Sequence, residues 1–193
     1  MGPGILFFLN SALFGVGLAM DAFSVSLANS LNEPEMKLPR MSLIAGTFGA
    51  FQALMPMLGW ALVSKAAELL EGFLKWTPWV ALLLLLYIGG KMLLEGLKGG
   101  EEARPAVSFR ELLVQGVATS IDALSVGFTI AGLTVGEALL ESGIIALVTF
   151  VICMGGLFIG KKAGKKLSGK ASVLGGVILI GIGIEIFVTG VIL

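Results

Sequence analysis

The sequence predicts an all-α, polytopic membrane protein whose six transmembrane helices form two inverted three-helix repeats. Composition is the first reason: 56% of the 193 residues are hydrophobic and mean hydropathy is +1.00. Only 13% are charged, against about 25% in soluble domains. The other reasons are six long apolar stretches and an internal repeat. So much apolar surface excludes soluble enzymes and nucleic-acid-binding proteins, and indicates a single transmembrane domain over residues 1–193.

About 20 apolar residues cross a bilayer as a helix, and the chain contains six such stretches. They are residues 5–29, 41–63, 78–97, 111–133, 142–160 and 172–192. We expect the first to be a retained span, because a signal peptide begins with basic residues and the first basic residue here is Lys37. Pro34 and Pro39 end the first helix, and Thr77 before Pro78 predicts the start of the third.

Basic residues are distributed unequally between the two sides of this domain. Of the 13, 11 lie in or beside the first, third and fifth connecting segments, and the other two, Lys65 and Lys75, lie in the second. Segments rich in Lys and Arg stay in the cytoplasm. The pattern therefore places these three loops inside the cell and both termini outside it.

An internal repeat relates the first span to the fourth. MDAFSVS at 20–26 matches IDALSVG at 121–127, an offset of 101 residues. The repeats cover about 1–100 and 101–193. Because each contains three spans, the two must cross the membrane in opposite directions, an architecture typical of secondary transporters with a substrate site near the midplane.

The repeated motif puts an acid, Asp21 or Asp122, inside each apolar helix. Such a charge costs roughly 2.5–3.5 kcal/mol at the centre of a membrane helix. The alternative is that each pairs with a lysine or stays protonated, but their symmetry favours an ion site between spans one and four. The chain has no histidine and one cysteine, Cys153, which excludes His-dependent catalysis and metal sites built on imidazole or several thiolates.

Hydroxyl and amide groups extend this candidate metal site. Ser24 and Ser125 follow the aspartates at i+3, on the same helical face. The fourth span carries a polar stripe, suggestive of a water-lined path, made of Gln115, Thr119, Asp122, Ser125 and Thr129. A single hydroxyl can instead bond to its own backbone. Gln52 in span two and Glu185 in span six are further candidates; Glu185 is interpreted as a proton carrier or a partner of Lys91.

These oxygen ligands suit a hard divalent cation such as Mg²⁺, Ca²⁺ or Mn²⁺. The cation is expected as transported substrate, and no cofactor is predicted. Glycines at a four-residue period, Gly156, Gly160 and Gly164, are interpreted as a seam for close helix packing.

Several stretches carry a family resemblance. They are AMDAFS at 19–24, FQALMPMLGW at 51–60, GGKMLLEG at 89–96, ATSIDALSVG at 118–127, LGG at 174–176 and IGIG at 180–183. In order and spacing they resemble the bacterial manganese efflux pump (MntP) family. The resemblance implies a six-span inner-membrane exporter of Mn²⁺, in a superfamily with lysine and cadmium exporters, for which Asp21 and Asp122 are essential. Some members carry glutamate at the position of Gln52.

The sequence bears on three other functions. An intramembrane aspartyl protease would need a Gly-x-Gly-Asp sequence, which neither aspartate has. An exporter of cadmium, lysine or another amino acid and a passive cation channel remain alternatives. Export against the membrane potential needs a coupled flow, and we expect proton exchange at the aspartates. The pattern does not specify an oligomeric state.

Overall fold

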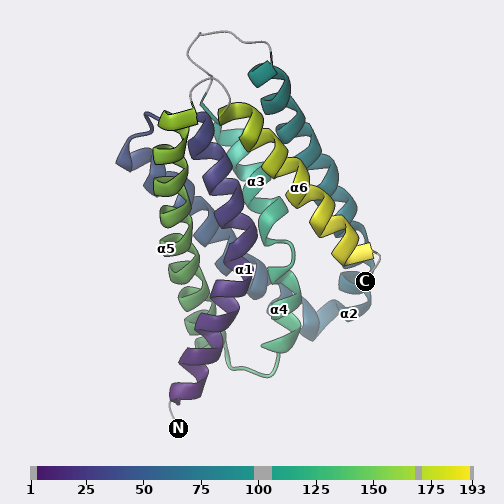
Figure 1. The fold of residues 1–193 in the computed structure, drawn as a ribbon. Helices are drawn as coiled ribbons and strands as arrows, with labels where there is room; N and C mark the ends of the chain where they lie inside the picture. Colours follow the sequence, from purple (N-terminus) through teal and green to yellow (C-terminus); the bar gives the residue numbers. More distant parts are fainter. Residues whose placement is uncertain (1–3, 98–105, 168–170, 192–193) are drawn as a thin grey trace.

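A computed structural model describes residues 4–97, 106–167 and 171–191, and every regular element in these ranges is an α-helix. Figure 1 shows their arrangement as a bundle. The elements are α1 (Ile5–Asn32), α2 (Leu38–Leu97), α3 (Phe109–Ser120), α4 (Ala123–Thr129), α5 (Val135–Leu167) and α6 (Ala171–Val191). The all-α prediction is confirmed.

Three helical segments are long and apolar enough to cross a bilayer: Ile5–Asn32, Leu38–Val63 and Val135–Gly164. Two shorter apolar helices, Pro78–Leu94 and Val173–Glu185, lie within α2 and α6. Large aliphatic side chains on the outside of the bundle, such as Leu13, Leu83 and Leu147, are at least 64% exposed. Such a surface matches lipid as the surrounding solvent, so the chain is a membrane protein.

The second and third predicted spans lie on one helical element. α2 continues through Pro56 and Pro78, so the predicted helix start at Thr77 is wrong. Figure 1 shows α2 descending and then turning back, so that its two ends lie toward the same end of the bundle. Proline is tolerated inside membrane helices because neighbouring groups satisfy the freed backbone.

The fourth predicted span, 111–133, is not one helix. α3 ends at Ser120, a turn covers residues 121–122, and α4 runs only from Ala123 to Thr129. The break falls at Asp122, one of the two predicted metal ligands. The fifth span is longer than predicted, because α5 extends beyond 142–160 at both ends.

Glycines set the closest helix contacts, as the seam predicts. A Cβ added to Gly156 would lie 2.8 Å from the Phe23 carbonyl oxygen, and one on Gly164 would lie 3.0 Å from that of Leu31. These contacts join α5 to α1. Gly59 and Gly127 meet in the same way where α2 crosses α4. Side chains larger than hydrogen would push these helices apart, so backbone approach is the main packing device.

Ion pairs and hydrogen bonds join the predicted first, third and fifth loops at one end of the bundle. Arg40 forms an ion pair with Glu33, with Nε 2.7 Å from Oε2, and also donates to the Val107 carbonyl oxygen at 2.7 Å. Lys161 donates to the Met36 carbonyl oxygen at 2.6 Å. Three other basic residues counted in the charge pattern, Lys98, Arg104 and Lys170, lie outside the described residues.

Candidate cation site

The two aspartates occupy unlike positions in the helical framework. Asp21 is half-buried in the middle of α1, which is unbroken. Asp122 is exposed and lies in the turn between α3 and α4. The two carboxyl groups are close enough to interact electrostatically, and Glu185 on α6 lies within the same range of Asp21. The two acids predicted from the repeat therefore lie within electrostatic range of each other.

Side chains take over the backbone hydrogen bonds at the break. In a continuous helix the Ala123 N–H would donate to the Thr119 carbonyl oxygen, four residues earlier. Here the Ala123 N–H donates to Asp122 Oδ1 at 2.8 Å, and the Thr119 oxygen accepts from Gln52 Nε2 at 3.0 Å. The residues after the break make i→i−3 backbone hydrogen bonds. One example is the Ser125 N–H, which donates to the Asp122 carbonyl oxygen at 2.9 Å. Asp122 and Gln52 thus stabilise the interrupted span.

Gln52 makes a second contact of the same kind on α1. Its Nε2 also donates to the Leu18 carbonyl oxygen, at 2.8 Å. The side chain is fully buried, and its Oε1 has no hydrogen-bond partner in the described structure. Leaving such an oxygen unsatisfied costs about 1–3 kcal/mol. Of the secondary candidates in the sequence, Gln52 is the one that contacts both aspartate-bearing segments.

The hydroxyl candidates divide into two groups. Ser24 donates to the Met20 carbonyl oxygen at 3.0 Å, and Thr119 to that of Gln115 at 2.9 Å. Both therefore make the local backbone bond that sequence alone could not exclude. Ser125 is exposed beyond the break, on the same short helix as Thr129. The break separates the buried members of the predicted polar stripe from its exposed members, so the stripe does not lie on one continuous helix.

Glu185 and Lys91 have different surroundings. Lys91 is paired with Glu111 on α3, with Nζ 2.6 Å from Oε1, whereas Glu185 is exposed on α6 near Asp21. Within the described residues, no three carboxylate or thiol side chains converge as a metal cluster. A cation between the aspartates would therefore need oxygen from amides, hydroxyls, carbonyls or water as well, which hard divalent ions accept.

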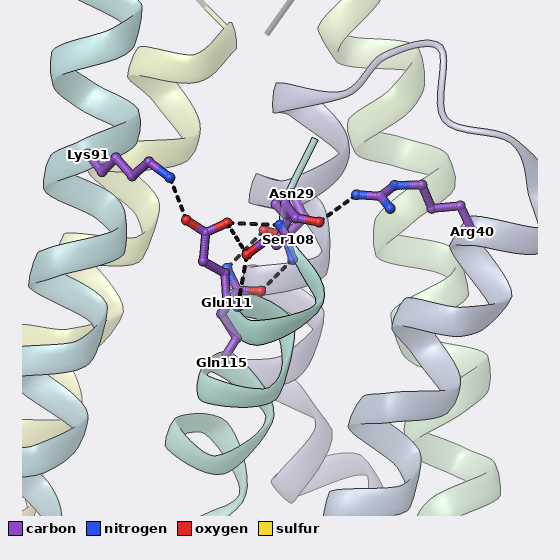
Figure 2. A network of polar contacts seen from close by, with 7 residues as sticks. Asn29, Arg40, Lys91, Ser108, Glu111 and Gln115 are labelled. Atoms are coloured by element: carbon purple, nitrogen blue, oxygen red, sulfur yellow. Dashed lines mark hydrogen bonds and ion pairs between the residues drawn. The ribbon is translucent and has the colours of Figure 1, made fainter. Parts of the chain in front are cut away.

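A buried amide pair, which the sequence analysis did not identify, connects α1 to α3. Asn29 Nδ2 donates to Gln115 Oε1 at 2.7 Å, and Gln115 Nε2 donates to Asn29 Oδ1 at 3.1 Å. Both side chains are fully buried. Figure 2 shows Asn29 and Gln115 together with Ser108 and Glu111, which cap α3 reciprocally. The available signal was an Asn and a Gln inside apolar helices, where polar side chains require partners.

Comparison with known proteins assigns the chain to a family. Residues 35–187 match the family described as "Putative manganese efflux pump". The chain belongs to this family. Similar proteins named "Putative manganese efflux pump MntP" occur in Ruminiclostridium cellulolyticum (39% identity; 91% of this chain and 93% of the relative), Methanosarcina mazei (41%; 93% and 95%) and Methanothermobacter thermautotrophicus (42%; 95% and 97%). No solved structure matches the chain.

Family membership confirms the resemblance found in the sequence. These relatives are named as transporters and not as enzymes. The matches cover 91–95% of this chain and 93–97% of the relatives, so the similarity extends over most of the predicted spans. The protease alternative has no support from them.

Proposed function

We propose that this chain is a secondary transporter that exports a divalent cation, Mn²⁺, from the cytoplasm through a site built on Asp21 and Asp122. The observation that supports it best is the meeting of two aspartates from an unbroken helix and an interrupted one. Interrupted helices form the midplane sites of many secondary transporters, because freed backbone groups and carboxylates coordinate ions there.

The surrounding architecture belongs to the same proposal. Six spans in two inverted repeats, with both termini outside, would form one multi-pass domain in the cell (inner) membrane. Ser24, Ser125, Thr119 and Glu185 would lie near the ion path without being its main ligands. The names of the relatives support Mn²⁺ as the cargo, and the oxygen-only ligand set is compatible with it.

Export also requires an energy source. Moving a dication outward against an inside-negative potential of 100 mV costs about 4.6 kcal/mol, since each elementary charge costs about 2.3. Two aspartates that release protons when Mn²⁺ binds and recover them after its release would keep the site neutral in both states. Proton exchange of this kind, with Glu185 as an accessory carrier, is therefore part of the proposed mechanism.

The test is metal uptake into inside-out membrane vesicles, comparing Mn²⁺, Mg²⁺, Ca²⁺, Fe²⁺ and Cd²⁺. We expect Mn²⁺ to accumulate against its gradient, and Asp21→Asn or Asp122→Asn to abolish this uptake, because one remaining carboxylate undercompensates a desolvated dication. Equilibration without accumulation would indicate a channel, and preference for Cd²⁺ would change the cargo.

Glu137→Gln is the matched control. Glu137 caps α5 by accepting from the Thr134 N–H at 3.0 Å, and glutamine can preserve that cap. The Glu137→Gln substitution removes one carboxylate from the protein and leaves both aspartates in place. Wild-type uptake by either aspartate variant, at equal amounts in the membrane, would refute the two-carboxylate site.

A further inference from the structure

The amide group of Gln52 lies between the two aspartate-bearing segments, where it contacts a backbone carbonyl three residues before each acid. A helical carbonyl points toward the C-terminal end of its helix, so the oxygens of Leu18 and Thr119 face the turns that contain Asp21 and Asp122. Gln52 Nε2 donates to both oxygens, at 2.8 and 3.0 Å. Leu18 and Thr119 are also equivalent under the 101-residue repeat.

These two contacts fix the orientation of the amide. A primary amide has two N–H donors on nitrogen and acceptor lone pairs on oxygen. If the group were flipped, Oε1 would face two carbonyl oxygens and both contacts would become repulsive. Nitrogen therefore occupies the position between α1 and the broken span, both of its hydrogens are used, and Oε1 is the atom left over.

Gln52 is 0% exposed, and its Oε1 has no hydrogen-bond partner in the described structure. Buried polar atoms in native proteins have partners, and an orphan calls for an explanation such as a bound ion. The oxygen belongs to a side chain held one helical turn from each of two acids. An amide oxygen is among the ligands that hard divalent cations use.

We propose that Gln52 is a third oxygen ligand for the cation held by Asp21 and Asp122, with Oε1 positioned by the two hydrogen bonds that its own nitrogen donates. This rests on the proposed function and adds a neutral donor to its two carboxylates. Gln52 then acts on both halves of the protein, because it contacts each half through an equivalent carbonyl and contributes to the site between them.

The ligand role predicts a change in metal preference that a packing role does not. Gln52→Met keeps the length of the side chain but replaces a hard oxygen with a soft thioether, which favours softer ions. Purified protein in detergent micelles is titrated with Mn²⁺, and bound metal is measured from the loss of the free-ion EPR signal; Cd²⁺ is then added as competitor. We expect Mn²⁺ affinity to fall on the order of tenfold and Cd²⁺ to compete more strongly than in the wild type.

Gln52→Glu provides the rescue and Thr149→Val the control. Glutamate restores a hard oxygen at the same reach but lacks the two N–H donors that position it. We therefore expect Gln52→Glu to show none of the gain in Cd²⁺ competition expected of Gln52→Met. Thr149 is another buried side chain whose oxygen lacks a hydrogen-bond partner in the described structure, on α5, and its loss should leave the Mn²⁺ and Cd²⁺ affinities unchanged. Circular dichroism and gel filtration establish that each variant is folded.

Two outcomes would overturn the ligand assignment: unchanged Mn²⁺ and Cd²⁺ affinities in Gln52→Met, or Cd²⁺ competing as strongly in Gln52→Glu as in Gln52→Met. The second would mean that loss of the amide, and not the thioether in place of an oxygen, changes the metal preference. Failure of the proposed function looks different, since wild-type protein would then neither bind nor move Mn²⁺. If Asp21→Asn abolishes binding while Gln52→Met does not change it, only the present inference fails.

Discussion

Replacing either Asn29 or Gln115 alone should destabilise the protein, and replacing both together should cost less than the two single losses added. Asn29→Leu leaves Gln115 with an unpaired oxygen and an unpaired N–H, and Gln115→Leu does the same to Asn29. Both side chains are fully buried, so water cannot replace the lost partner. The double variant removes both polar groups together and leaves an apolar contact between α1 and α3.

The expected loss in the free energy of unfolding follows from the two hydrogen bonds between the amides, at 2.7 and 3.1 Å. In a water-soluble protein, each buried group left unsatisfied would cost about 1–3 kcal/mol. Hydrogen bonds between membrane helices measure less, averaging about 0.6 kcal/mol with a maximum near 1.7, because the unfolded state in the membrane also finds partners. The lower scale applies here. Each single variant loses two such bonds, so we expect its free energy of unfolding to fall by about 1–3 kcal/mol. The double variant should lose less than the sum of the two single losses.

Unfolding in mixed micelles, with SDS as denaturant and helicity followed by circular dichroism, gives the four free energies of the cycle. Mn²⁺ binding is the internal control, because Asn29 lies eight residues beyond Asp21, about 12 Å along α1. Its dissociation constant should stay within about twofold, a change of under 0.5 kcal/mol. Strictly additive losses in the double variant would show that the two amides do not depend on each other, and would refute the reasoning.

Two further predictions concern orientation and coupling. The Gly136→Cys variant should react with a membrane-impermeant thiol reagent in intact cells, and the Ser168→Cys variant only after the cells are opened. The reverse pattern would invert the proposed topology. The native Cys153 is buried and should not be labelled in either case. In inside-out vesicles that enclose a pH-sensitive dye, Mn²⁺ uptake should make the interior more alkaline, and Asp122→Asn should abolish the change. Mn²⁺ uptake that moves no protons would exclude the proposed exchange.

Composition and hydropathy were enough to predict an all-helical membrane protein, because both act over whole segments. The glycine seam was also readable, since Gly156 and Gly164 recur at helical spacing and lie against α1. Helix boundaries were predicted less well. Thr77 and Pro78 form a good helix start by local rules, yet α2 continues through them. Two reciprocal caps, Ser108 with Glu111 and Thr134 with Glu137, had the S/T-x-x-E signature and could have been predicted.

The site was predictable in its acids but not in its geometry. Asp21 and Asp122 are readable because an acid in an apolar segment is costly and the motif around it is repeated. The break at Asp122 has no local signal: residues 118–126 contain neither proline nor glycine. The Thr119 carbonyl oxygen at the break accepts from Gln52, which is 67 residues away in the chain. A contact of that kind follows from packing and not from any pattern within the fourth span.

The two halves differ at the one position that matters most for this contact. Under the 101-residue alignment, the counterpart of Gln52 in the second half is Cys153, which is buried and has no amide to donate. Span one and span four share the Asp-Ala-x-Ser-Val motif, yet α1 is continuous and the fourth span is interrupted. The motif therefore cannot be the cause of the interruption. The amide of Gln52 cannot be the cause by itself either, because it makes the equivalent hydrogen bond to the Leu18 carbonyl oxygen of the unbroken α1. What distinguishes the fourth span is the Asp122 side chain, whose Oδ1 accepts from the Ala123 N–H, the donor that a continuous helix would pair with the Thr119 carbonyl oxygen.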